Sequence, residues 1–167
     1  NERVLIFSGK NWHGGVIGIV AARLVGKYGK PCFVITDDGE FANAMTHPAK
    51  HVPKTYRVTI RPSITEDQIT ALTTGVEIDG RMTLPSEVRV ISKQEGRVVL
   101  EIIIYEGRNR QIRKMCETLG LEVARLKRTQ IGSVKLGMLK QGDWRNLTEE
   151  EVHKLMVAAT VDRKAQK

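Results

Sequence analysis

The segment RVVLEIIIYEGRNRQIRKM, residues 97–115, is the most informative part of this chain. Its first half is largely aliphatic and predicts a long apolar strand. Its second half is basic and predicts a helix from about Arg108 to Leu119, which stops at Gly120. A strand that leads into such a helix can bind phosphate, because free N–H groups at the helix N-terminus add to the side-chain charge. A solvated basic helix face is the alternative.

The composition points to a polyanionic partner. The 167 residues include Lys+Arg 27 against Asp+Glu 19, a net charge of +8, and the pI is about 9.7. The simplest partner for such a chain is nucleic acid, and a merely soluble basic protein is the alternative. A hydrophobic content of 41% is enough for the core of one domain, whereas 5% aromatic residues argues against recognition through several stacked bases.

Cysteine and histidine positions give no sign of a metal site. Cys32 and Cys116 lie far apart without metal-ligand spacing, which favours a reducing compartment. His47 and His51 are four residues apart, but Pro48 argues against a shared helix face, so we expect no bound metal. No stretch approaches about 20 apolar residues and no signal pattern is visible, so we expect a cytoplasmic protein without a membrane partner.

Residues 1–36 predict a β-α-β unit. Residues 4–8 and 32–36 have the apolar content of short strands, and residues 14–28 have that of a buried helix. Two strands joined by a helix of this length are expected to be parallel, with a right-handed crossover. The turn signal Asp37-Asp38-Gly39 then marks a change of pattern.

Residues 37–160 predict an α+β domain with a mixed, largely antiparallel sheet and flanking helices. Capping boxes mark two helix starts, one at Thr65 with Gln68 and one at Thr148 with Glu151. The tail 161–167 is expected to be disordered. The expected helices are 40–46, 65–74, 108–119 and one that begins near 148, and the expected strands are 54–60, 87–92, 97–105 and 121–131.

Several separated motifs in this second part bring a known family into view. They are DGEFAN (38–43), His47-Pro48, KTYRV (54–58), EGRNRQIRKM (106–115), Leu126-Lys127-Arg128, Ile131-Gly132 and LTEEE (147–151). In their order and spacing, residues 37–160 resemble the pseudouridine synthases of the RsuA and RluB type. The resemblance implies the fold of that family and the cofactor-free conversion of a uridine in ribosomal RNA to pseudouridine. In that reaction a flipped-out uridine meets an aspartate.

The resemblance also implies roles for individual residues. Tyr56 would lie against the uracil, although a half-buried strand tyrosine packed in the core is the alternative. Arg113 would pair with the catalytic aspartate and keep it ionised. Ile112 would form an apolar wall of the base pocket. The expected RNA phosphate contacts, which position RNA without reading its sequence, are Lys54, Arg57, Arg108, Arg110, Lys114, Lys127 and Arg128.

The sequence departs from this family at the catalytic aspartate. The family's Gly-Arg-Leu-Asp motif is expected about a dozen residues before the Asp38-Gly39 turn, where this chain has Ala22-Arg23-Leu24-Val25, and an ungapped count arrives at Gly26. No Asp or Glu occurs between Glu2 and Asp37. Valine and glycine cannot act as nucleophiles. We therefore expect RNA binding with absent or very weak catalysis, unless an acid such as Asp37 or Asp38 is recruited.

The first 36 residues resemble a different family. Trp12-His13, GVIGIVAARL (15–24) and YGKP (28–31) are similar to single-stranded-DNA exonucleases of the RecJ type, whose Asp-His-His metal motif is not found in this sequence. We hypothesise that the chain is a chimera joined near residues 37–40. Three functions stay open: an active synthase, an inactive RNA-binding module, and a nucleic-acid-binding accessory domain of an exonuclease.

Overall fold

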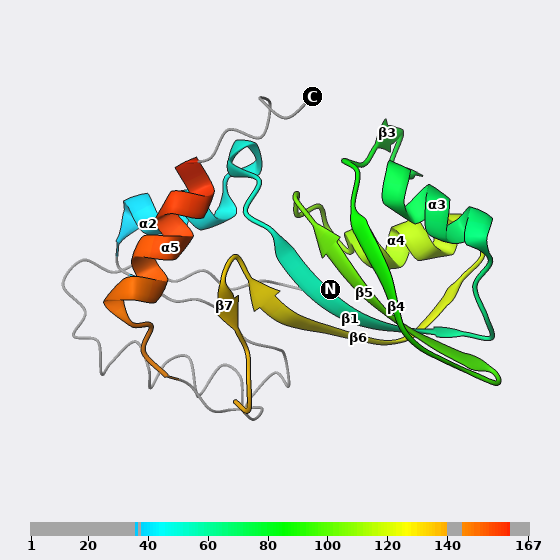
Figure 1. The fold of residues 1–167 in the computed structure, drawn as a ribbon. Helices are drawn as coiled ribbons and strands as arrows, with labels where there is room; N and C mark the ends of the chain where they lie inside the picture. The colour runs from blue at the N-terminus through cyan, green and yellow to red at the C-terminus, as the bar shows by residue number, and fades with distance from the viewer. Residues whose placement is uncertain (1–35, 37, 140–144, 161–167) are drawn as a thin grey trace, which may run out of the picture.

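The computed structural model describes residues 36, 38–139 and 145–160, which form a curved antiparallel sheet with helices (Figure 1). The sheet order is β4-β5-β1-β6-β7, and every neighbouring pair is antiparallel. This confirms the α+β prediction. The predicted β-α-β unit of residues 1–36, apart from residue 36 itself, and the tail 161–167 lie outside the described residues. The strands are β1 (Lys54–Arg61), β4 (Glu87–Gln94), β5 (Arg97–Ile104), β6 (Glu122–Ile131) and β7 (Val134–Lys135).

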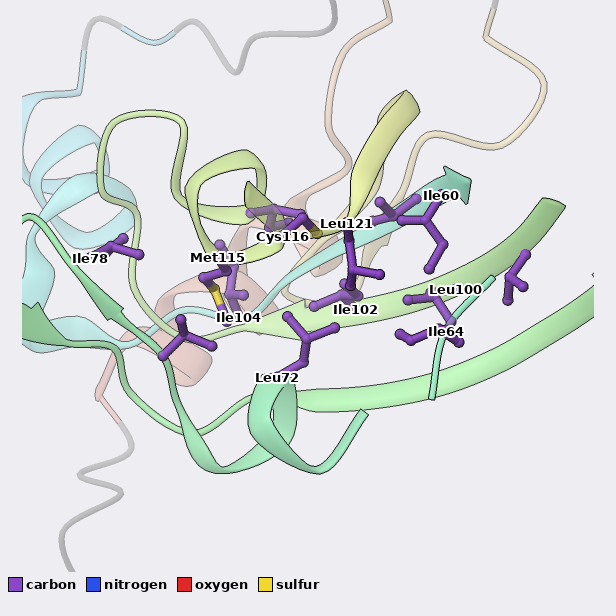
Figure 2. Close-up of a cluster of buried hydrophobic side chains, with 14 residues drawn as sticks. Ile60, Ile64, Leu72, Ile78, Leu100, Ile102, Ile104, Met115, Cys116 and Leu121 are labelled. Atoms are coloured by element: carbon purple, nitrogen blue, oxygen red, sulfur yellow. The ribbon is translucent and has the colours of Figure 1, made fainter. Parts of the chain in front are cut away.

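The larger of two hydrophobic clusters lies between one face of the sheet and the helices α3 (Glu66–Thr74) and α4 (Gln111–Thr118). Strand alternation supplies the sheet side of this first cluster, since every second residue of β5 is buried. Figure 2 shows Met115 and Cys116 of α4 pointing toward the sheet. The cluster consists of Val58, Ile60, Ile64, Leu72, Val76, Ile78, Val98, Leu100, Ile102, Ile104, Ile112, Met115, Cys116 and Leu121.

The second hydrophobic cluster joins α2 (Gly39–Thr46) to α5 (Glu149–Thr160). In Figure 1 these two helices lie together at the end of the sheet away from α3 and α4. Val52, just before β1, belongs to this second cluster, and Tyr56 on β1 packs against the first. The start of β1 therefore lies where the two clusters meet.

Side-chain caps define the starts of α2, α3 and α5, and the sequence predicts two of them, at Thr65 and Thr148. The Thr65 hydroxyl accepts from the Gln68 N–H (3.2 Å), and the Gln68 side chain accepts from the Thr65 N–H (2.9 Å). Thr148 and Glu151 form the same reciprocal pair before α5, at 3.2 and 3.0 Å. Asp38 caps α2, since its Oδ1 accepts hydrogen bonds from the backbone N–H groups of Glu40 (2.9 Å) and Phe41 (3.0 Å). Of the helices that the structure describes, none is both long and apolar enough to cross a membrane.

Four details differ from the sequence prediction. Helix α4 begins at Gln111 rather than Arg108, because Arg110 adopts a left-handed conformation (φ 52°) directly before it. A small hairpin of β2 (Glu77–Ile78) and β3 (Arg81–Met82) was not predicted. Its Asp79-Gly80 turn has positive φ at both residues, for which Asp-Gly is a strong signal. The short β7 and the 3₁₀ turn η1 (Pro48–Lys50) were also not predicted.

Two glycines with similar backbone conformations give a matched test of the second cluster. Gly132 has φ +53°, and a Cβ there would lie 2.6 Å from Leu155 Cδ2. Gly137 has φ +60°, and a Cβ there would meet nothing within 4 Å. Both alanine variants suffer the left-handed strain, and only Gly132→Ala also overpacks the cluster. We expect Gly132→Ala to lower the free energy of unfolding by about 2–4 kcal/mol and Gly137→Ala by about 1 kcal/mol in urea titrations. Equal losses would show that α5 does not pack on this turn.

Candidate functional site

The residues predicted to face RNA converge on the start of β1. Strand β1 pairs with β5 on one side and β6 on the other, and Tyr56 lies between Ile102 and Arg128 in the register. Tyr56 is half-buried against the first cluster, so both its predicted uracil contact and the core alternative fit this position. Lys54 lies between the ends of β5 and β6. The loop that leads from β5 to α4 passes beside it.

Lys54 forms the centre of a cationic site at this point. Its Nζ donates to the Val52 carbonyl at 3.2 Å, and a Cβ built on Gly107 would lie only 3.9 Å from the same Nζ. Burial, and then the positive charge of Arg128, lower the pKa of the Lys54 ammonium. A phosphate bound here would offset both effects. We call Lys54, Tyr56, Arg128 and Gly107 the cationic site.

A carboxylate holds the loop beside the cationic site. Glu106 Oε1 accepts from the Leu84 N–H (3.0 Å) and from Gln111 Nε2 (2.9 Å), while its Oε2 accepts from Arg108 Nε (3.1 Å). Gln111 Oε1 in turn accepts from the Arg108 N–H at 3.0 Å. These bonds keep residues 106–110 out of the helix. Sequence reasoning missed Glu106 and Gln111, because the only signal was their place inside the basic run.

Two cations predicted to contact phosphate are engaged with the β2–β3 hairpin. The Arg108 guanidinium donates to the carbonyls of Arg81 (3.0 Å) and Met82 (2.5 Å). Lys114 Nζ pairs with Asp79 Oδ2 at 2.5 Å. An RNA phosphate would have to compete with these partners. Their phosphate contacts stay predictions, and in this structure Arg108 and Lys114 hold the hairpin against the loop and α4.

Arg113 and Tyr56 are not brought together. Arg113 Nη1 donates to the Val123 carbonyl at 3.3 Å, and Val123 lies opposite Ile60 in the register. Ile60 is four residues from Tyr56, which corresponds to about 13 Å along a strand. Ile112 is 3% exposed and belongs to the first cluster. The described conformation therefore places the guanidinium at the far end of the β1–β6 pair from Tyr56.

Arg113 has no carboxylate partner in the part of the chain that the structure describes. Within residues 36, 38–139 and 145–160, no acidic side chain forms a salt bridge with Arg113. Asp38, one of the two acids considered for recruitment, caps α2. Asp37, the other, lies outside the described residues.

The remaining predicted residues lie apart from the cationic site. Arg57 and Lys127 are exposed, and the alternation of β1 puts them on the opposite face of the sheet from Tyr56. Arg110 is exposed in the turn before α4. His47 and His51 contact different backbone groups. His47 Nδ1 accepts from the Ala49 N–H at 3.2 Å, and His51 Nδ1 lies 3.3 Å from the Tyr105 carbonyl oxygen.

The Arg108 bonds predict a stability effect. Arg108→Ala removes donors from Glu106 and from two carbonyls, and we expect it to lower the free energy of unfolding by about 2 kcal/mol. Lys127→Ala, at an exposed strand position, should change it by less than about 0.5 kcal/mol. Urea titrations of the two variants measure both values. Similar small losses in both would contradict the structural role of Arg108.

The lowered pKa of Lys54 predicts a pH effect on stability. Above its folded-state pKa and below the ordinary value of 10.5, Lys54 binds fewer protons in the folded chain than in the unfolded chain. It therefore destabilises the fold at neutral pH, and this cost disappears as the pH rises through that window. We expect the stability gained by Lys54→Met at pH 7 to shrink toward pH 10.5 in denaturant titrations. A gain that stays constant or grows with pH would contradict the lowered pKa.

Comparison with known proteins agrees with the fold and the motifs. The profile of the RNA pseudouridylate synthase family matches residues 32–118, which is more than half of the chain. The uncharacterized RNA pseudouridine synthase YtzG of Bacillus subtilis (strain 168) is 40% identical over 124 residues, which cover 73% of this chain and 52% of YtzG. The ribosomal large subunit pseudouridine synthase B of the same organism is 35% identical over 128 residues, which cover 75% and 52% of the two chains.

A solved structure gives the same result. The crystal structure of a pseudouridylate synthase superposes with a TM-score of 0.66 and 32% sequence identity, covering 72% of this chain and 52% of the other. The chain spans about half the length of the relatives named above. The family match begins at residue 32, so it includes the last residues of the segment 1–36 for which the sequence motifs predicted an exonuclease fragment. The match over residues 32–118, with the shared fold, shows that this chain belongs to the RNA pseudouridylate synthase family.

Proposed function

We propose that this chain binds ribosomal RNA through the cationic site, with Lys54 and Arg128 contacting a phosphate next to a uridine that lies against Tyr56. Family membership supports RNA as the partner, and a relative named as a ribosomal large subunit pseudouridine synthase supports ribosomal RNA. The aromatic ring and the two cations provide the two contacts that an extruded nucleotide needs, one for the base and one for the backbone. A ribosomal RNA target also agrees with the predicted cytoplasmic location.

The half-buried ammonium of Lys54 is the observation that carries this proposal. A cation that is partly desolvated and lies in the field of a second cation is unfavourable by itself. The carboxylate next to Gly107 in the chain, Glu106, is occupied by its bonds to Leu84, Arg108 and Gln111. A phosphate would supply the missing negative charge. RNA binding is therefore the function that the geometry supports best.

We also propose that the chain alone does not isomerise uridine above background. The family resemblance implies that an aspartate meets the uridine, and Arg113 would keep it ionised. In the described conformation Arg113 instead donates to the Val123 carbonyl, and Asp38 caps a helix. The rival reading is an active synthase whose acid, such as Asp37, lies outside the described residues. The exonuclease resemblance of residues 1–36 is carried by sequence motifs only and stays a prediction.

Two measurements on a ribosomal RNA fragment test this function. In binding titrations, Lys54→Gln should weaken binding and make the dependence of log affinity on log salt shallower by about 0.7–0.9. Lys93→Gln, which removes an exposed charge at the β4–β5 turn, is the matched control and should change neither value. In the second measurement, pseudouridine formation should stay at background.

Each measurement has a result that contradicts its proposal. Equal salt dependence for the Lys54→Gln variant and the wild type would exclude the cationic site as the phosphate contact. Pseudouridine formation above background that Tyr56→Phe or Arg113→Ala abolishes would overturn the proposal of inactivity and support the rival reading.

A further inference from the structure

The face of the sheet opposite α3 and α4 is strongly cationic. Residues that alternate with the buried ones along the strands point to this side. In Figure 1 both α3 and α4 lie on the inner side of the curved sheet, so this face is the outer one. We call it the open face, and it carries six exposed cations: Arg57, Arg61, Arg89, Arg97, Arg125 and Lys127.

One row of the open face crosses four neighbouring strands. Glu101 is the only carboxylate in this row, and its contact with Arg89 is long at 3.7 Å, with the Arg89 side chain 76% exposed. Such an exposed pair neutralises little. The other carboxylates on this face, Glu87 and Glu122, lie in different rows. The row consists of Arg89, Glu101, Arg57 and Lys127.

The pair at the β6 end of this row consists of two cations, although Arg57 also lies opposite Glu101 on its other side. Arg57 and Lys127 are directly opposite each other on adjacent antiparallel strands. Like charges at directly opposite positions destabilise a sheet. Arg125 precedes Lys127 by two residues on β6, and its side chain lies on the same face of the sheet. The repulsion between cations therefore continues along β6. An external polyanion would convert this repulsion into attraction.

The chemistry of the open face selects the kind of polyanion. None of the described strand residues that point to this face is aromatic, and Tyr105, just after β5, is held by the hydrogen bond from its hydroxyl to Glu87. The strands themselves therefore offer no platform on which unpaired bases can stack. Its cations are spread over adjacent strands about 5 Å apart, and Arg57 and Arg61 are about 13 Å apart along β1. Cations distributed in this way can contact successive phosphates without touching bases. A fully paired duplex, which presents phosphates on its outside, fits these properties better than a single strand.

We propose that the open face binds the phosphate backbone of double-stranded RNA. The choice of RNA rests on the proposed function, whereas the contact itself does not use the cationic site. Tyr56 and Lys54 lie on the other face of β1. A helical stem can therefore be held by the open face independently of any nucleotide at the cationic site.

The test is a binding titration of the full chain with a fully paired RNA duplex of about 16 base pairs, which offers no unpaired uridine. The variant is Arg57→Gln/Lys127→Gln. The matched control is Lys93→Gln/Lys154→Gln, which removes the same charge from the β4–β5 turn and from α5, where Lys154 forms only an exposed pair with Glu150.

We expect the open-face variant to raise Kd about ten-fold and to make the salt dependence shallower by about 1.8, since each lost phosphate contact contributes about 0.9. The control should change Kd less than about two-fold. The open-face variant removes a repulsion, so its urea midpoint should not fall below that of the wild type. Tyr56→Phe should bind the duplex like the wild type.

Any of three duplex-binding results would overturn the proposal: no binding of the duplex by the wild-type chain, equal weakening in the variant and the control, or a duplex affinity that Tyr56→Phe lowers as much as the open-face variant does. Stronger binding to vesicles that contain phosphatidylserine than to the duplex, with the same sensitivity to Arg57 and Lys127, would also overturn it. Failure of the isomerisation or Lys54 experiments would leave this duplex result unaffected, so the two proposals fail separately.

Discussion

The structure depends on the pairing of β1 with strands on both of its sides. This strand aligns with β5 through seven residue pairs and with β6 through eight, so it fixes the register of the whole sheet. Its alternation sends Val58 and Ile60 into the first cluster, where both are fully buried. A shift of one residue would exchange the apolar side chains of β1 with Arg57 and Arg61. The core, the cationic site and the open face therefore follow from a single register.

This register also separates two kinds of positive charge. At the start of β1, Lys54 is half-buried beside Gly107 and Arg128. The positive charges there are few, and that of Lys54 is partly desolvated. On the open face the charges are more numerous and exposed. The first arrangement suits one phosphate at a defined position, and the second suits a backbone with many phosphates. Arg113 belongs to neither, because its guanidinium donates to the Val123 carbonyl.

Much of the fold could be predicted from sequence because its signals are local. The Thr65–Gln68 and Thr148–Glu151 boxes mark helix starts within four residues, and strand alternation is visible in residues 54–60. The start of α4 could not be predicted, because Glu106 bonds to Leu84, which is distant in the chain. The positions of Arg108 and Arg113 are set by tertiary contacts in the same way. The Asp79-Gly80 turn has a local sequence signal for a hairpin. Its two strands have only two residues each, which is too short for a visible alternation pattern.

The start of β1 holds a half-buried lysine, Lys54, which we propose binds a phosphate. The most direct test is an NMR titration of the Lys54 side chain, assigned with a Lys54→Arg variant, without RNA and with a ribosomal RNA fragment. We expect a Lys54 pKa below the ordinary value of 10.5 in the free protein and a higher pKa when RNA is bound. An ordinary Lys54 pKa in the free protein that RNA leaves unchanged would contradict it.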